Sequence, residues 1–455
     1  MSLLNLSIQQ SGKAADKLEG KSRLEKLELF NKVLTLIEQQ YYRDVDTAKL
    51  IEGAINGMMG TLDPHSAYLD KEVFQKMQDE TSGEFGGLGI EVTQKDGVLL
   101  IVTPIEDSPA EKAGILAGDR IVEINHEPVV GLGLEKSMDK FRGKKKSKIT
   151  LGIIREGHEG IKNIEIVRDT VYLKPVKFEL LKDQVAYIRL SQFQKKSGEY
   201  ILEALKKMKS EAPKNQLNAI ILDLRSNPGG LLDEAVEVAS LFIDDGIVVS
   251  TEGRDPKNKE FRYVKKGGYK DLTTPMAVLI NGSSASASEI VAGALQDNKR
   301  ALVMGTQSFG KGSVQSVVKL QEEMGVKLTI AQYMTSAGRK IQALGIKPDV
   351  EIDEVEAEWV GQNKKEPNFL REKDLKNHLT ATLETEEEKK LREELEFKER
   401  LQRAEKYNLI KEKKRKSKDA KNLVNEEESK KIAPIDDYMV KQAINYLANL
   451  NRLKK

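Results

Sequence analysis

Apolar residues recur at a helical interval in the first part of the chain. One stripe spans residues 24–37 and a second spans residues 50–58, with apolar side chains three or four positions apart. The second stripe stops at Gly60, shortly before an Asp-Pro pair, and such a stop is typical of a helix end. We therefore predict a helical N-terminal region over residues 1–84.

The pattern then changes to short apolar runs separated by turn residues, which predicts β-strands. The runs cover residues 89–92, 98–102, 120–124 and 148–154. Two short helices fit between them. The first has a capping residue, Pro109 at its first position and Gly114 after its end, and the second runs over about residues 134–142. We predict a small β-barrel with two helices over residues 85–158.

A third pattern, strands alternating with helices, covers residues 170 to about 355, within a region that we take as 159–355. The predicted strands are 185–190, 219–224, 276–280 and 301–304, and the predicted helices are roughly 198–209, 231–242 and 288–297. Nearly continuous apolar strands indicate a parallel or mixed sheet that is covered by helices. We therefore expect a multidomain α+β protein whose largest unit is an α/β domain.

The remaining residues, 356–455, are highly charged. Leucines at positions 391, 395, 401 and 409 are typical of solvated helices, and residues 438–453 are amphipathic again. The simplest interpretation is a solvated helical arm, and a dimerisation arm is the alternative. Nucleic-acid binding is disfavoured because acidic runs alternate with basic ones.

Composition narrows the possible functions. The 455 residues are enough for about two to four domains. The 74 basic and 72 acidic residues give a net charge of +2, which disfavours a nucleic-acid footprint. The absence of cysteine removes thiol nucleophiles, disulfides and cysteine metal sites. No apolar run reaches the length of a membrane span, and no signal peptide is visible at the N-terminus.

Histidine is also scarce. The chain has four, at positions 65, 126, 158 and 378, and none lies in the α/β region. A Ser-His-Asp triad would need a histidine from another domain, and a three-histidine zinc site would need dispersed ligands. Both are therefore disfavoured, and the sequence implies no metal or other cofactor.

Three segments of the α/β region have the composition of a catalytic site. At residues 280–290 a strand ends in a serine-rich turn before a helix, which suits a nucleophile but also occurs as a plain loop or cap. Lys311 lies between two glycines; if it is partly desolvated, its pKa falls and it can act as a general base. Alternatively it is a surface lysine, and the phosphate-loop motif fails because residue 312 is glycine.

The third segment, residues 223–231, follows a buried strand and opens a helix. Gly229 and Gly230 expose backbone N–H groups that suit an oxyanion hole, although a tight turn alone would explain them equally well.

Together these segments resemble the carboxyl-terminal processing (tail-specific) proteases, a family of serine peptidases. The motifs are Asn-Gly-Ser-Ser-Ala-Ser-Ala-Ser-Glu at 281–289, Phe-Gly-Lys-Gly-Ser-Val-Gln at 309–315, Asp-Leu-Arg-x-Asn-Pro-Gly-Gly at 223–230 and Gly-Ile-Lys-Pro-Asp-Val at 345–350. The similarity covers roughly residues 40–352. It implies a crotonase-like protease core at 159–355 that needs no cofactor.

The resemblance also implies roles for individual residues. Ser286 corresponds to the nucleophile and Lys311, 25 residues later, to its base, while Gln315 orients the lysine. The oxyanion hole corresponds to the amides of Ala287 and of Gly229 or Gly230. Ser284 and Ser288 flank the nucleophile and are the rival candidates, although Ser288 suits a helix N-cap better.

Residues 85–158 resemble the PDZ domain of the family. Its carboxylate-binding loop corresponds to residues 84–91, where glycine-rich amides would receive the terminal carboxylate of a substrate. The implied substrate-binding residues are Gly87, Leu88, Gly89, Ile90, Met138, Phe141 and Arg155. For Arg155 an ordinary surface ion pair is the alternative.

The resulting hypothesis is a serine endopeptidase that degrades or processes proteins from or near their C-termini. The resemblance implies protein substrates with exposed C-termini, an adaptor protein, a homo-oligomer built from dimers and a periplasmic or other extracytoplasmic site in a bacterium. The main alternative is a PDZ-based binding or scaffold protein with a dormant protease fold. Hydratase-like chemistry is a third possibility, but it leaves the Ser-Lys pair without a role.

Overall fold

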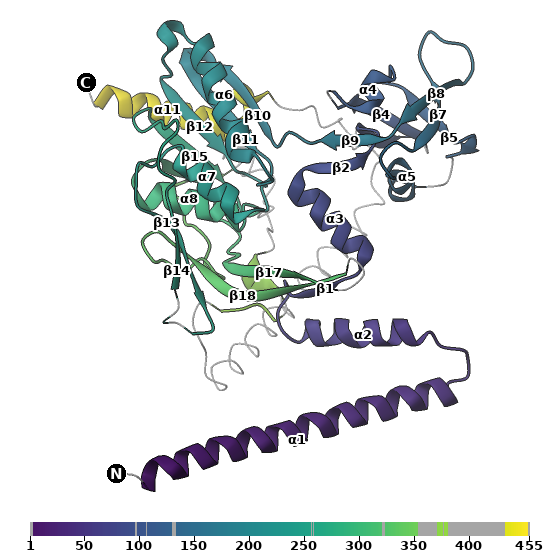
Figure 1. Cartoon of the computed structure of the whole chain (residues 1–455). Coiled ribbons are helices and arrows are strands. Elements are labelled where there is room, and N and C mark those ends of the chain that lie inside the picture. The colour runs from purple at the N-terminus through teal and green to yellow at the C-terminus, as the bar shows by residue number, and fades with distance from the viewer. Residues whose placement is uncertain are drawn as a thin grey trace, which may run out of the picture.

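A computed structural model of the chain describes residues 3–95, 98–105, 107–129, 133–255, 257, 259–320, 324–353, 371–375, 377–380 and 433–453. The helices predicted around the leucines at 391–409 lie outside the described residues. Figure 1 shows a helical N-terminal part, a β-rich domain and a larger α/β core that lies beside it. The α+β class is therefore confirmed.

The N-terminal helices form where the apolar stripes predict them. Helix α1 spans Leu3–Gln40 and α2 spans Thr47–Gly60, and Asp46 caps α2 by accepting hydrogen bonds from the amides of Ala48 and Lys49. Much of the apolar stripe of α1 stays exposed to solvent, including Leu24 and Leu27. Figure 1 shows α1 and α2 extending away from the rest of the chain. Among the described residues, no helix is both long and apolar enough to span a bilayer.

The β-rich domain contains a sheet in the order β3-β4-β5-β7-β8. Its strands are β3 (Ile90–Lys95), β4 (Val98–Pro104), β5 (Arg120–Ile124), β7 (Lys148–Ile154) and β8 (Lys162–Val167), with the short β6 (Glu127–Pro128) paired to β5. Helices α4 (Pro109–Lys112) and α5 (Leu134–Phe141) complete it, so both predicted helices are confirmed. Strand β8 belongs to this sheet although it lies beyond residue 158, where the sequence analysis placed the end of the domain.

Two connections join this domain to the core. Helix α3 (Lys71–Ser82) leads into β2 (Glu84–Gly87), which pairs with β9 (Asp169–Tyr172) in a separate two-stranded sheet. Figure 1 shows α3 on one path and the link from β9 to the core on the other. The segment that enters the β-rich domain, β2, and the segment that leaves it, β9, therefore lie side by side in this small sheet.

The core contains a sheet in the order β10-β11-β12-β15-β16-β19. Strands β11 (Val185–Leu190), β12 (Ala219–Asp223), β15 (Met276–Ile280), β16 (Leu302–Gly305) and β19 (Val350–Glu351) are parallel, and β10 (Val176–Leu181) is an antiparallel edge. Helices α6 (Ser197–Glu211), α7 (Leu232–Ser240) and α8 (Ala287–Asp297) contribute to the apolar core on one face of this sheet. The predicted strands and helices of this region are confirmed.

A second sheet, which the periodicity did not predict, borders the core. It contains β1 (Ala67–Leu69), β13 (Ile247–Gly253), β14 (Lys259–Tyr263), β17 (Ser313–Lys319) and β18 (Gly325–Thr335). All five residues of β14 are exposed, so this strand lacks the apolar face that marks a strand in a sequence. Strand β1 pairs with β18, which attaches the N-terminal region to the core.

The opposite face of the core sheet is covered by the C-terminal helix α11 (Tyr438–Leu453). Its buried residues Met439, Val440, Ala443 and Leu447 pack against buried strand residues such as Ile221. This helix is therefore part of the hydrophobic core, and the interpretation of residues 438–453 as part of a solvated arm was wrong. The amphipathic pattern was correct, but its apolar stripe has a partner within the same chain.

Candidate active site

The serine-rich turn lies between β15 and α8. Ser286 has φ 55° and ψ −113°, a backbone conformation that non-glycine residues rarely adopt. The Ser284 hydroxyl donates to the carbonyl of Leu224 at 2.8 Å, and the Ser288 hydroxyl donates to the carbonyl of Asn227 at 2.9 Å. In contrast, the Ser286 hydroxyl donates to none of the described residues. Ser284 and Ser288 therefore stabilise the turn, and of these three serines only Ser286 keeps its hydroxyl proton available within the described residues.

Lys311 lies in the loop after β16, and its side chain is held by a polar relay. Its Nζ donates to Gln315 Oε1 at 2.8 Å, and Gln315 Nε2 in turn donates to Thr329 Oγ1 at 3.2 Å. Thr329 Oγ1 donates to the carboxylate of Asp63 at 3.0 Å. Within the described part of the chain, no hydrogen bond joins Ser286 to Lys311. The lysine is thus directed toward Gln315 in this structure.

The electrostatic surroundings of Lys311 favour its neutral form. Burial is the largest influence, because it disfavours the ammonium, and the nearby cation Lys327 acts in the same direction. The carboxylates of Glu372, Glu289 and Asp63 oppose them. The net result is a Lys311 pKa below its ordinary value, as a lysine base requires.

Glu289 joins the backbones of the two candidate catalytic residues. Its Oε2 accepts hydrogen bonds from the amides of Ser286 at 2.7 Å and Lys311 at 2.9 Å. Its Oε1 accepts from the Ser308 hydroxyl at 2.6 Å and from the Gly310 amide at 2.7 Å. Burial raises the pKa of Glu289 to about 7, while these hydrogen bonds act in the opposite direction.

No role for Glu289 was predicted from the sequence, although a signal was present. A glutamate three residues after a serine at a helix start is the pattern of a capping box. That pattern explains the bond to the Ser286 amide, but it does not indicate that the same carboxylate reaches the lysine loop.

The glycine turn lies directly against Ser286. Gly229 has φ 104°, and a Cβ added there would lie 2.7 Å from the Cβ of Ser286. The Gly229 amide donates to Asn227 Oδ1 at 2.9 Å, whereas the amides of Gly230 and Ala287 donate to none of the described residues. Of the two glycines, Gly230 therefore has the amide that is free to receive an oxyanion, together with that of Ala287.

The candidate residues of the β-rich domain lie mostly in its interior. Leu88, Ile90 and Phe141 are buried in its core, and Met138 packs against them. Gly87 belongs to β2. Gly89 has φ 76°, and a Cβ there would lie 2.3 Å from the Cβ of Ser108, so this position requires glycine.

Arg155 forms a two-pronged ion pair with the buried Asp119, with both N···O distances at 2.7 Å, so its guanidinium is already paired inside the domain.

A segment of the C-terminal region also reaches the lysine loop. The buried Glu372 pairs with Nε2 of His65 at 2.7 Å and accepts a hydrogen bond from Gln342 Nε2 at 2.9 Å. Gln342 Oε1 accepts from the Gly312 amide, next to Lys311, at 2.9 Å. Glu372 was not found from the sequence because its partners are far away along the chain. His65 thus links the N-terminal region to this C-terminal segment.

Comparisons with known proteins agree with this architecture. Peptidase family S41 matches residues 184–352, a PDZ domain matches residues 86–166, and the activating protease CtpB N-terminal domain matches residues 3–73. A carboxy-terminal-processing protease from Bartonella bacilliformis is 47% identical over 327 residues, which cover 71% of this chain and 74% of the relative. The carboxy-terminal processing protease CtpA of Bacillus subtilis is 36% identical over 73% of this chain and 70% of its own length.

Among solved structures, the photosystem II D1 C-terminal processing protease is 29% identical, with a TM-score of 0.41. The match covers 71% of this chain and 92% of that one. The domains and their order define a serine peptidase that carries a PDZ domain. More specifically, the chain belongs to peptidase family S41, among the carboxy-terminal processing proteases of bacteria.

The close approach of Gly229 to Ser286 generates a prediction with a matched control. Gly229 and Gly246 have φ of 104° and 106°, but a Cβ on Gly246 would meet nothing within 4 Å. Alanine at either position should lower the free energy of unfolding by about 1–3 kcal/mol through backbone strain. Only Gly229→Ala should also displace the Ser286 turn and abolish casein cleavage. Urea unfolding and casein cleavage measure the two effects, and full cleavage by Gly229→Ala would contradict the proposed contact.

Proposed function

We propose that this peptidase cleaves proteins at or near their C-termini through an acyl-enzyme formed on Ser286. Neutral Lys311 takes the Ser286 proton, and Ser286 attacks the scissile carbonyl. The amides of Ala287 and Gly230 stabilise the oxyanion. The intermediate then collapses: the peptide bond breaks, the Lys311 ammonium gives its proton to the departing amine, and neutral Lys311 next takes a proton from the water that hydrolyses the ester. Gln315 orients the lysine. The observation that carries this proposal is that Glu289 accepts from the backbone amides of both Ser286 and Lys311.

The side chains are not yet in the arrangement that the reaction requires. Among the described residues no hydrogen bond joins Lys311 Nζ, which donates to Gln315, to the Ser286 hydroxyl, so the two side chains have to approach each other before the proton can be transferred. This observation favours a resting form of the enzyme. A PDZ-based binding protein with a dormant protease fold is the second candidate, because such a protein would keep the same arrangement permanently.

The PDZ domain is proposed to engage the C-terminal tail of the substrate. Its glycine-rich segment at residues 84–91 leads into β3, which offers a strand beside which a peptide can add. Because Arg155 is paired with Asp119, the backbone amides of this segment are the better candidates for binding the terminal carboxylate. Tails of protein substrates are thus the proposed ligands, and an adaptor protein is a further proposed partner.

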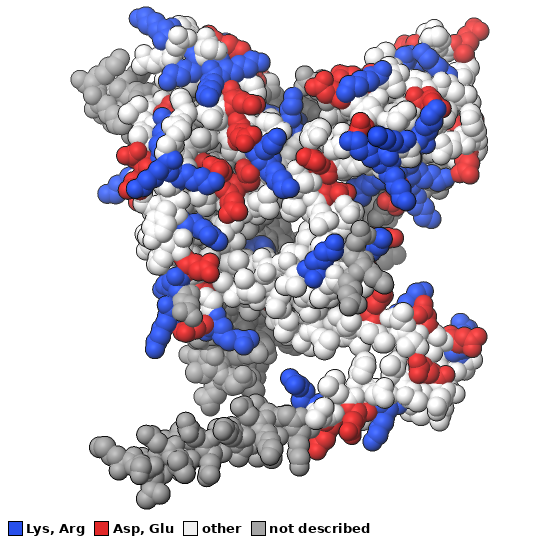
Figure 2. Space-filling model, in the orientation of Figure 1, with Lys and Arg blue, Asp and Glu red and all other residues white. Residues whose placement is uncertain are grey.

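We also propose a homo-oligomer built from dimers and an extracytoplasmic location. The exposed apolar stripe of α1 supports the oligomer, because such a stripe normally packs against a partner. The surface in Figure 2 mixes both signs of charge, and nucleic acid is not among the proposed partners.

Ser286→Ala tests the catalytic assignment. Casein cleavage and labelling by a fluorophosphonate probe should both fall by about 10³-fold or more, because the nucleophile is lost. Ser283→Ala is the matched control in the same turn, since Ser283 is exposed, and it should retain activity. If the wild type is labelled but Ser286→Ala still cleaves casein, Ser286 is not the nucleophile. If the probe does not label the wild type, and peptides that mimic substrate C-termini do not activate it, the PDZ-based binding protein with a dormant protease fold is favoured.

The neighbouring cation Lys327 provides a test of the base. Neutral Lys311 is the reactive form, so activity should rise with pH through the lowered pKa of this lysine. Lys327→Gln removes a charge that lowers the Lys311 pKa, so the rising limb of kcat/KM should move to higher pH. Lys319→Gln, on the exposed end of β17, is the control and should leave the limb in place. An unchanged limb in Lys327→Gln would argue against Lys311 as the base.

The apolar stripe of α1 generates the prediction for the oligomer. Leu27 is exposed in a single chain and would be buried in the proposed interface between copies. Leu27→Glu should therefore dissociate the oligomer, because it would bury an unpaired carboxylate in that interface. Lys32→Glu changes an exposed residue on the opposite side of the helix and should have little effect. Multi-angle light scattering gives the mass of each variant. A monomeric wild type would rule out the oligomer.

A further inference from the structure

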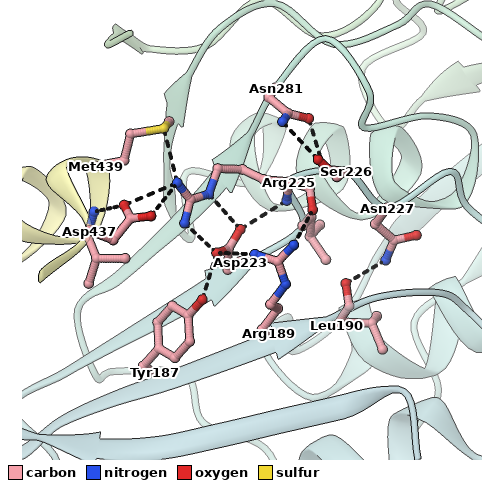
Figure 3. A network of polar contacts seen from close by, with 12 residues as sticks. Tyr187, Arg189, Leu190, Asp223, Arg225, Ser226, Asn227, Asn281, Asp437 and Met439 are labelled. Atoms are coloured by element: carbon pink, nitrogen blue, oxygen red, sulfur yellow. Dashed lines mark hydrogen bonds and ion pairs between the residues drawn. The ribbon is translucent and has the colours of Figure 1, made fainter. Parts of the chain in front are cut away.

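The C-terminal helix contacts the residue that precedes the glycine turn. Arg225 lies between β12 and Gly229, and its side chain is only 8% exposed. Its Nη1 lies 3.1 Å from Asp437 Oδ1 and 3.0 Å from Asp437 Oδ2, and it also donates to Met439 Sδ at 3.4 Å. Figure 3 shows Asp437 and Met439 approaching Arg225 from α11, while Asp223 approaches it from the sheet.

The pairing with Asp437 completes the neutralisation of a buried charge. Asp223 is fully buried and binds Nε of Arg225 at 2.9 Å and Nη2 at 2.6 Å. The same carboxylate also accepts from the Tyr187 hydroxyl at 2.8 Å and from Arg189 Nη1 at 3.3 Å. Two guanidinium groups thus share one carboxylate, and Asp437 supplies the second negative charge. Within the described part of the chain, Arg225 Nη1 donates only to Asp437 and Met439, at the start of the α11 segment.

The backbone beyond Arg225 is fixed at successive positions. The Ser226 amide donates to Asn281 Oδ1 at 2.9 Å. The Asn227 carbonyl accepts from the Ala285 amide at 3.0 Å, and its side-chain oxygen accepts from the Gly229 amide at 2.9 Å. A displacement of Arg225 would therefore be transmitted along a tightly bonded turn to Gly229 and the nucleophile, because few of its bonds can change independently.

The other side of the contact is equally well fixed. Asp437 precedes α11 and accepts the amide of Val440 at 3.1 Å, so the same carboxylate caps the helix. Met439, Val440, Ala443 and Leu447 are buried against the sheet, which holds the helix in place. Asp437 is therefore presented to Arg225 from a rigid element, as effective positioning requires.

We propose that α11 positions the oxyanion turn through the Asp437–Arg225 ion pair, so that Asp437 is a positioning residue of the peptidase, 212 residues after Arg225. This inference rests on the proposed acyl-enzyme mechanism. The ion pair touches neither the reacting atoms nor the PDZ domain. It therefore acts on the rate of the chemical step and leaves substrate binding unchanged.

The test separates the ion pair from the helix cap. Asp437→Ser keeps a good capping residue but has too short a side chain to reach Arg225, so kcat should fall roughly tenfold with KM within about twofold. Asp437→Asn keeps an oxygen at the same reach and should recover most of this loss. Asp436→Ser, at the exposed neighbouring position, should behave as wild type. The measurements are kcat and KM on a peptide substrate, the rate of fluorophosphonate labelling at Ser286, and thermal unfolding.

A purely structural role would give a different result. In that case Asp437→Ser would unfold at a lower temperature but retain wild-type kcat and labelling rate well below its unfolding midpoint, and this outcome would overturn the inference. A raised KM with unchanged kcat would also overturn it. If Asp437→Ser does not fold, Asp437→Thr takes its place, because threonine also caps a helix and is likewise too short to reach Arg225; a wild-type kcat in the folded Thr variant has the same meaning. Activity that does not depend on Ser286 would instead refute the proposed mechanism, and the inference with it.

Discussion

The buried carboxylate of Glu289 is the interaction on which the rest of the site depends. Each of its oxygens accepts two hydrogen bonds, and the donors come from the nucleophile turn and from the lysine loop. Removing a carboxylate from water costs several kcal/mol, and these four donors offset that cost, so the loss of any of them would destabilise the site. The two loops follow different strands of the sheet, and a shared acceptor fixes their separation more strictly than packing alone. The backbones of Ser286 and Lys311 are therefore held by the same carboxylate.

The sheet explains why these loops meet at all. Strands β12, β15 and β16 are neighbours and parallel, so their carboxyl ends lie along one edge. The glycine turn, the serine turn and the lysine loop follow these three strands in that order. Ligand sites of open parallel sheets form at this edge. The close approach then requires small or strained residues: Gly229 has no room for a Cβ beside Ser286, and Ser286 itself has a positive φ.

The features that could be predicted from the sequence are those that depend on local pattern. Strands 185–190 and 276–280 were predicted with their observed bounds, because they are nearly continuous apolar runs, interrupted only by Arg189, between polar turns. Strand β14 could not be predicted, since all its residues are exposed and it gains its place only by pairing with β13. The same limit applies to Glu372 and Asp437. Their partners His65 and Arg225 are 307 and 212 residues away, and no periodicity reports contacts over such separations.

These two distant contacts change the meaning of the C-terminal region. Glu372 reaches the lysine loop through Gln342, and Asp437 reaches the glycine turn through Arg225. One carboxylate thus supports the loop of the proposed base, and the other supports the turn of the proposed oxyanion hole. Both are parts of a region whose composition resembles a solvated arm. Because most charged residues of such a region are expected to face solvent, its composition does not reveal the few carboxylates that are buried or paired inside the core. A peptidase domain that ended at residue 355 would retain every motif of the family, but it would lack both of these supports and the helix that covers one face of its sheet.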